Sequence, residues 1–260
     1  MNILDKIVQT KHLEIDVLLG ETGFEELYRR AQAVSRPAIS FSEALRRTSK
    51  PAIIAEFKRK SPSKGFINRD TDPTTVVKGY AEKGATAISV LTDREYFGGS
   101  LDDLAAARRV VDIPLLRKDF IIDPCQICEA KIAGADAILL IAAALTPEWC
   151  VALAGFARGL GLEVLLEIHN EAELSHINPD VDMVGVNNRD LTTFVTDTAV
   201  SERLAGLIPS EFVKISESGI SSPDTVRKLH GMGYGGFLMG ENFMKHPDPV
   251  DALEQFIKSL

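Results

Sequence analysis

Cysteine is scarce in this chain of 260 residues: there are only three, at positions 125, 128 and 150. A small, odd number cannot form a disulfide framework, so we expect a reducing compartment, the cytoplasm. Cys125 and Cys128 form a C-x-x-C pair, but they fall early in an expected helix and no second pair completes a zinc site. The pair therefore predicts packing rather than redox or metal chemistry.

Long apolar runs and an excess of positive charge are missing as well. No apolar run reaches the ~20 residues of a membrane span, and the charged start Met1–Lys6 predicts no signal peptide. The formal net charge of −8 argues against a general nucleic-acid surface. We therefore expect a soluble protein without membrane or nucleic-acid partners. An anionic ligand would need a local basic cluster, and one is present in Lys58, Arg59, Lys60 and Lys64.

Short apolar runs alternate with helical patterns from residue 51 onward. The runs lie at 53–57, 87–91, 114–118, 137–141, 163–167, 182–187, 212–217 and 236–240. The helical segments are 73–83, 101–110, 124–133, 147–159, 170–177, 197–207, 222–231 and 249–259, and several begin with a capping residue and proline. Strict alternation predicts a parallel sheet, and eight units close a (β/α)8 TIM barrel. A doubly wound sheet would not need eight similar units.

About 50 residues precede the first expected strand. Apolar positions at helical spacing predict helices over 2–19, 24–34 and 42–47. We expect residues 1–50 to form a helical extension packed over one end of the barrel, either as a lid on its mouth or only as a plug over apolar surface. No low-complexity linker divides the chain, so residues 1–260 are expected to form one domain.

Charged and amide side chains lie at the carboxyl ends of the expected strands or just beyond them, where TIM-barrel active sites lie. They are Glu56 and Lys58 at the end of the first strand, Lys118 at the end of the third, Glu167 of the fifth, Asn187 and Arg189 of the sixth and Glu217 of the seventh. A single such charge is usually solvated or paired. Several that converge on one mouth can shift one another's pKa values toward proton transfer. His169 is expected to lie where a helix cap begins rather than to belong to the catalytic group.

Glycine and serine follow the last two expected strands, as Ser218-Gly219 and Gly240. In TIM barrels the loops after strands seven and eight often bind phosphate through backbone N–H groups. Glycine lets the backbone approach the phosphate closely. Both loops together predict a phosphorylated small-molecule substrate.

Seven motifs spread over nearly the whole chain carry a family resemblance. They are Ile54–Ser63, Leu91–Ser100, Leu116–Pro124, Gly134–Ile141, Glu163–Asn170, Val186–Leu191 and Ser216–Ser221. In these motifs the chain resembles indole-3-glycerol-phosphate synthase, the lyase of tryptophan biosynthesis. The resemblance implies closure of 1-(2-carboxyphenylamino)-1-deoxyribulose 5-phosphate to indole-3-glycerol phosphate, with loss of CO2 and water. It implies neither a cofactor nor a metal.

The resemblance also implies a role for each matched residue. Lys118 matches the lysine that protonates the ketone oxygen, and Glu167 matches the catalytic glutamate of the dehydration. Lys58 would pair with the substrate carboxylate and act as an auxiliary proton donor, although the division of acid roles between the two lysines stays open. Glu56 would orient a lysine, and Asn187 and Glu217 would hydrogen-bond substrate oxygens and the lysines.

Two further groups of residues match substrate-binding positions of the family. Ser61, Ser218, Gly219 and Gly240 fit phosphate contacts, with Arg189 as support for the mouth. Phe97, Phe120, Leu139 and Leu191 match positions around the anthranilate ring, and plain packing is their alternative. Glu241 departs from members with a small hydroxyl residue there, and we expect its side chain to turn outward because a carboxylate repels phosphate.

Two other functions fit parts of the pattern. Phosphoribosylanthranilate isomerase is another phosphate-binding barrel enzyme, but it needs no carboxylate-binding lysine, so Lys58 discriminates against it. A non-catalytic barrel that binds phosphometabolites would tolerate loss of Lys118 or Glu167, and both are intact. The expected oligomeric state is a monomer, with a weak homodimer as the alternative.

Overall fold

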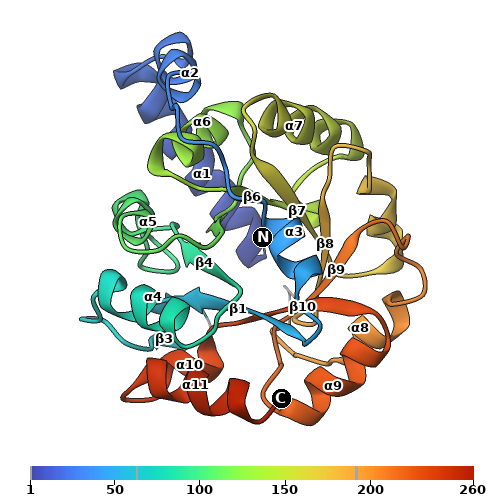
Figure 1. Ribbon diagram of the computed structural model, residues 1–260. Coiled ribbons are helices and arrows are strands. Elements are labelled where there is room, and N and C mark those ends of the chain that lie inside the picture. The colour runs from blue at the N-terminus through green and yellow to red at the C-terminus, as the bar shows by residue number, and fades with distance from the viewer. Residues whose placement is uncertain (1, 63, 191–192) are drawn as a thin grey trace.

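Eight parallel strands close into a barrel at the centre of the computed structural model, which describes residues 2–62, 64–190 and 193–260 (Figure 1). The strands are β1 (Ala52–Phe57), β4 (Ala87–Leu91), β5 (Leu115–Lys118), β6 (Ala137–Ile141), β7 (Glu163–Ile168), β8 (Met183–Asn187), β9 (Val213–Glu217) and β10 (Tyr234–Met239). The barrel closes because β1 pairs with β4 on one side and with β10 on the other. The predicted TIM barrel is confirmed.

Helices surround the strands on the outside, as Figure 1 shows. They are α4 (Pro73–Glu82), α5 (Leu101–Arg108), α6 (Pro124–Ala133), α7 (Pro147–Gly159), α8 (Ala199–Leu204), α9 (Pro223–Gly231), α10 (Glu241–Met244) and α11 (Pro249–Lys258). The expected cap-and-proline starts are observed: the side chains of Asp72, Asp123, Thr146 and Ser222 accept backbone N–H groups of the first turn. These caps fix where each helix begins relative to the strand before it.

Four segments differ from the expected elements, and one of them is the short helix α10 between β10 and α11. The helix expected over 170–177 is a short 3-10 helix, η2 (Glu171–His176), and Pro179 beyond it disfavours a helical Asn178. A further 3-10 turn, η1 (Ala142–Ala144), follows β6. The basic turn after β1 contains a small antiparallel pair, β2 (Lys60–Ser61) and β3 (Gly65–Phe66). This pair carries the basic cluster over the carboxyl end of β1.

The N-terminal helices reach both ends of the barrel, so the expectation that residues 1–50 pack over one end is wrong. Helix α3 (Phe41–Arg47) buries Phe41 and Leu45 against barrel-interior side chains. At the start of β7, Glu163 accepts hydrogen bonds from Ser40 Oγ at 2.6 Å and from the Ser42 backbone N–H at 2.7 Å. Helix α3 therefore closes the amino end of the barrel, opposite the expected site.

The other two N-terminal helices lie elsewhere on the barrel. Helix α2 (Phe24–Gln32) packs beside α6 at the rim, as Figure 1 shows. Helix α1 (Ile3–Glu21) begins with a capping box between Asn2 and Asp5, and its first turns reach the carboxyl ends of the strands. Within the described residues, no helix is both long enough and apolar enough to cross a bilayer.

Candidate active site

A cavity of about 520 Å³ lies at the carboxyl ends of the barrel strands. Its lining includes every predicted site residue in the described part of the chain: Glu56, Lys58, Ser61, Phe97, Lys118, Phe120, Leu139, Glu167, Asn187, Arg189, Glu217, Ser218, Gly219 and Gly240. Leu191, predicted beside the aromatic pair, lies outside the described residues. Side chains from distant parts of the sequence therefore meet in one place.

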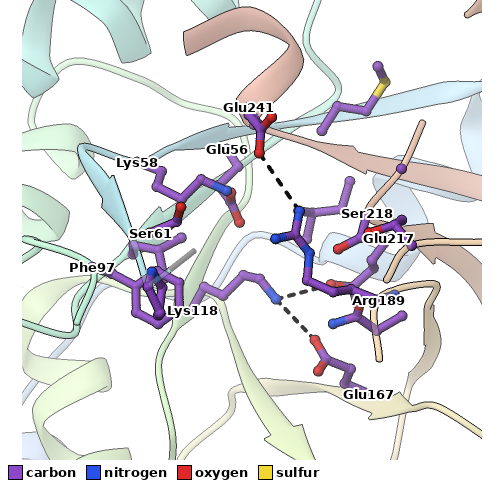
Figure 2. A pocket seen from close by; sticks show the side chains of 18 of the residues that line it. Glu56, Lys58, Ser61, Phe97, Lys118, Glu167, Arg189, Glu217, Ser218 and Glu241 are labelled. Atoms are coloured by element: carbon purple, nitrogen blue, oxygen red, sulfur yellow. Dashed lines mark hydrogen bonds and ion pairs between the residues drawn. The ribbon is translucent and has the colours of Figure 1, made fainter. Parts of the chain in front are cut away.

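Lys118 occupies the centre of this cavity, between two carboxylates (Figure 2). Its Nζ atom lies 3.1 Å from Oε2 of Glu167 and 3.0 Å from Oε2 of Glu217. The three residues lie at the carboxyl ends of β5, β7 and β9, with Glu167 one residue before the end of β7. These are alternate strands, whose inward-facing side chains share a layer of a TIM barrel. Both carboxylates are almost fully buried, so they interact with Lys118 with little solvent screening.

The environment separates the proton affinities of the two glutamates. Burial would raise the pKa of Glu167, but the charge of Lys118 and contacts from His169 and Asn187 hold it below its ordinary value. Burial raises the pKa of Glu217 to about 7; Lys118 opposes this rise, and the charges of Glu167 and Glu56 add to it. Near neutral pH, Glu167 is therefore a carboxylate, whereas Glu217 exchanges a proton.

Lys118 itself is an ammonium ion at neutral pH. Burial would lower its pKa, but the carboxylates of Glu167, Glu217 and Glu56 raise it above its ordinary value. A buried ammonium inside a substrate cavity can donate a proton to an oxygen on which negative charge develops.

Glu56 and Lys58 form an ion pair of 2.7 Å at the end of β1, where their spacing of two residues puts both side chains on the same side of the extended chain. Gly240, directly after the neighbouring strand β10, makes room for Glu56, because a Cβ at Gly240 would lie 2.3 Å from Glu56 Oε1. Gly185 of β8 makes room for Glu217 in the same way, because a Cβ at Gly185 would lie 2.3 Å from Glu217 Oε1. Sequence analysis missed Gly185, although glycine within a strand often marks such a close approach.

The expected phosphate-binding residues all line the cavity. Ser218 has a φ of 63° and Gly219 a φ of 71°, so two successive residues adopt the left-handed conformation. This conformation is strained for serine and costs of order 1–3 kcal/mol, which is characteristic of ligand-binding turns. Ser61 Oγ is buried in the cavity lining and has no hydrogen-bond partner among the described residues. An oxyanion would satisfy this hydroxyl.

Helix α1 supplies an apolar wall and a buried lysine. Ile3, Leu4 and Ile7 line the cavity, so α1 contributes to its lid rather than acting only as a plug. Lys11 Nζ lies 2.8 Å from Oδ2 of Asp93 and 3.1 Å from Oδ1 of Asp119. These two acids follow β4 and β5 in the chain, so one cation joins two loops of the mouth.

The same acids hold the aromatic pair of the cavity. Oδ1 of Asp93 accepts the backbone N–H of Phe97 at 3.0 Å, and Oδ1 of Asp119 accepts that of Phe120 at 2.8 Å. The two rings lie 5.9 Å apart, centroid to centroid. Lys11 therefore supports the aromatic side of the cavity through two carboxylates.

His169 lies directly behind Glu167 and, as expected, next to a helix cap. The N-cap of η2 is Asn170, whose side chain accepts the Glu173 N–H. His169 places Nε2 3.3 Å from Oε1 of Glu167 and Nδ1 3.2 Å from Oε2 of Glu173. Its spacing of two residues from Glu167 was the signal for this position, because such residues share a side of an extended chain.

A family model described as indole-3-glycerol phosphate synthase matches residues 4–259. The chain belongs to the indole-3-glycerol phosphate synthase family. Three relatives with that name come from Bacteroides thetaiotaomicron, Acidithiobacillus ferrooxidans and Aliarcobacter butzleri. The Bacteroides protein is 49% identical, and the match covers 100% of this chain and 99% of that protein. The Acidithiobacillus protein is 43% identical over 97% of both chains, and the Aliarcobacter protein is 40% identical over 99% of both.

Solved structures add a fold likeness at low identity. A tryptophan synthase alpha-subunit from Pyrococcus furiosus superposes with a TM-score of 0.61 and 15% identity, and the match covers 80% of this chain and 97% of that chain. At this identity the likeness concerns the barrel fold alone, whereas the family membership rests on the sequence matches.

Glu241 does not take the outward position that was expected for it, because it lines the cavity. Its Oε1 atom lies 2.5 Å from Nζ of Lys64, and its Oε2 atom lies 3.7 Å from a guanidinium nitrogen of Arg189, the contact drawn in Figure 2. Burial would raise the pKa of Glu241, but Lys64, Lys58 and Arg189 lower it. The repulsion argument failed because these cations neutralise the carboxylate.

Replacing Lys11 by methionine is expected to lower the free energy of unfolding by about 3–5 kcal/mol, because it leaves Asp93 and Asp119 buried without their shared cation. Urea denaturation measures the change. The matched control is Lys78→Met, which removes an exposed helical pair with Glu82 and is expected to cost about 0.5 kcal/mol or less. Equal stability of the two variants would refute a structural role for Lys11.

Proposed function

We propose that this chain converts 1-(2-carboxyphenylamino)-1-deoxyribulose 5-phosphate to indole-3-glycerol phosphate, CO2 and water, as a carboxy-lyase of tryptophan biosynthesis. The observation that carries the proposal is Lys118 held between Glu167 and Glu217, with a second lysine, Lys58, lining the same cavity. Family membership over residues 4–259 supports the same reaction.

Substrate binding divides between the two sides of the cavity in this proposal. The phosphate is bound by Ser61 and by the backbone of Ser218, Gly219 and Gly240, with Arg189 beside it. The anthranilate ring lies against Phe97, Phe120 and Leu139, and Leu191 belongs to the same proposal by its motif alone. Lys58 pairs with the ring carboxylate. Binding both ends of the substrate holds the ring carbon near the ketone carbon. The conformational entropy that their approach costs is therefore lost on binding and not in the reaction step.

Ring closure and decarboxylation use Lys118. The ring carbon that bears the carboxylate attacks the ketone carbon, and the Lys118 ammonium gives its proton to the ketone oxygen, which becomes a hydroxyl group. The carboxylate then leaves as CO2, and its bonding electrons restore the aromatic ring. Glu56 orients Lys58, and Asn187 and Glu217 hydrogen-bond the substrate oxygens and Lys118.

Dehydration completes the indole. The new hydroxyl leaves as water with a proton from Lys58, the auxiliary donor, and the nitrogen lone pair assists its departure. Glu167, kept ionised by its surroundings, removes a proton from the adjacent CH2 carbon. These steps use side chains of this chain and require no cofactor.

Cellular setting and assembly belong to the same proposal. The three cysteines are unpaired and buried, which suits the reducing cytoplasm. The cavity lining comes from one chain, which suits a monomer. We also propose that residues 1–260 form one domain, because α1 packs at the carboxyl end of the barrel and α3 closes its amino end.

The test is incubation of the protein with the carboxyphenylamino sugar phosphate. Indole fluorescence is expected to rise, with one CO2 released for each indole formed. Phosphoribosylanthranilate isomerase, the rival barrel enzyme, would release no CO2. Absence of both signals from folded protein would refute the proposed function.

A further inference from the structure

We propose that His169 is a positioning residue, whose imidazolium holds the Glu167 carboxylate in place and keeps it ionised after Lys118 has given up its proton. This role rests on the proposed function, in which Lys118 is the acid and Glu167 the base. His169 does not line the cavity, so it acts on the substrate only through Glu167.

The position of the His169 ring is fixed from behind by Glu173 of η2. Oε2 of Glu173 accepts the backbone N–H of His169 at 2.7 Å and lies 3.2 Å from Nδ1 of its ring. Oε1 of the same carboxylate accepts a hydrogen bond from Asn170 Nδ2 at 2.7 Å. With Nδ1 held in this way, Nε2 is directed toward Glu167.

The contact between His169 and Glu167 is an interaction between two charges. Nε2 of His169 lies 3.3 Å from Oε1 of Glu167, is buried, and has no aligned hydrogen-bond acceptor in the described part of the chain. Burial would lower the pKa of His169, but Glu167 and Glu173 raise it to about 10. The ring is therefore an imidazolium at neutral pH, in a place where little water screens its charge.

Glu167 consequently has a cation on each of its two oxygens. Lys118 of β5 lies at Oε2 and His169 at Oε1, while Asn187 of β8 adds a hydrogen bond. The other charged groups of the cluster are Glu217 of β9 and Glu56 of β1, both of which act on Lys118. Lys118 is therefore shared between Glu167 and these two carboxylates, whereas His169 is not shared with them.

This asymmetry matters at the moment when Lys118 becomes neutral. Its proton goes to the ketone oxygen, and Glu167, Glu217 and Glu56 lose their shared cation together. Glu217, with its raised pKa, is the carboxylate that can take up a proton. Glu167 retains the His169 imidazolium, so it stays ionised and in place for the dehydration that follows.

The main test is His169→Gln, measured over a range of pH. We expect kcat to fall by about 10- to 100-fold with little change in KM, as for other residues that orient a reacting group. The acid limb of the kcat profile is expected to move to higher pH, because Glu167 loses a cation that lowers its pKa. A purely structural role would change stability without moving this limb.

A second variant keeps the histidine and removes its partner. In Glu173→Gln the pKa of His169 is expected to fall, because one of the two carboxylates that raise it is gone. The imidazolium is then lost at lower pH than in the wild type, so the alkaline limb of kcat moves to lower pH. The matched control is His230→Gln, whose ring contacts the Tyr234 carbonyl outside the cavity lining and which is expected to keep the wild-type profile.

The outcomes separate the two proposals. If the wild type forms no indole, the proposed function fails. If the wild type is active, and if His169→Gln is folded and has the same kcat and the same acid limb as the wild type, only the positioning role fails. Circular dichroism and urea midpoints of each variant establish that folded molecules are compared.

Discussion

Replacing Lys118 by alanine is expected to lower kcat by a factor of about 10² or more, because the ketone oxygen loses its proton donor. The lysine lies between Glu167 and Glu217 at the centre of the cavity, so no neighbouring cation can reach the same point without moving. The fold is expected to persist, since Glu217 can bind a proton and water can enter the space. Turnover followed by indole fluorescence measures the loss.

The matched control for Lys118→Ala is another barrel-strand lysine. Lys214 of β9 bonds the Ala205 carbonyl at 2.7 Å and is not part of the cavity lining, so Lys214→Ala is expected to keep its turnover per folded molecule. Near-wild-type turnover of Lys118→Ala would make the acid assignment wrong and would point to Lys58 as the principal donor.

Replacing Glu167 by glutamine is also expected to lower kcat by a factor of about 10² or more, because an amide cannot accept the proton of the CH2 group. Glutamine has nearly the same shape as glutamate, so the variant removes a charge rather than volume. Ring closure still has Lys118, whose pKa falls when one of its carboxylates is removed. Dehydration then becomes the slow step.

The two products distinguish this assignment from a general loss of activity. In Glu167→Gln, CO2 is expected to appear before indole in a single turnover, since decarboxylation precedes the step that needs the base. In Lys118→Ala both products are expected to be delayed together. Equal rates of CO2 and indole formation in Glu167→Gln would show that Glu167 acts before or during ring closure.

Much of the barrel and most of the central site could be predicted from local sequence. Parallel barrel strands are buried on both faces, so they read as short apolar runs, and capped helices mark the connections between them. Charges that directly follow such runs, such as Lys118 and Glu217, must lie at the carboxyl end of the barrel. The number and order of the strands are therefore enough to predict that these two side chains lie at the same end of the barrel.

The features that sequence reasoning missed depend on contacts between distant segments. In the sequence, Lys11 occupies an ordinary polar position of an amphipathic helix. The residues next to it in the sequence do not indicate that it is buried beside Asp93 and Asp119. The outward orientation expected for Glu241 ignored Lys64, because the turn after β1 could not be placed over the loop after β10. Local periodicity carries no information on such pairings.

The ion pairs of Lys11 also bear on the order in which the molecule is completed. They join the first helix to Asp93 and Asp119, which follow β4 and β5 much later in the chain. Such contacts between remote segments form only after a large loop has closed. Helix α1 gains them once both strands are in place, so the aromatic side of the cavity obtains its support late in folding. Helix α1 thus precedes β4 and β5 in the chain but reaches its partners only after both strands have formed.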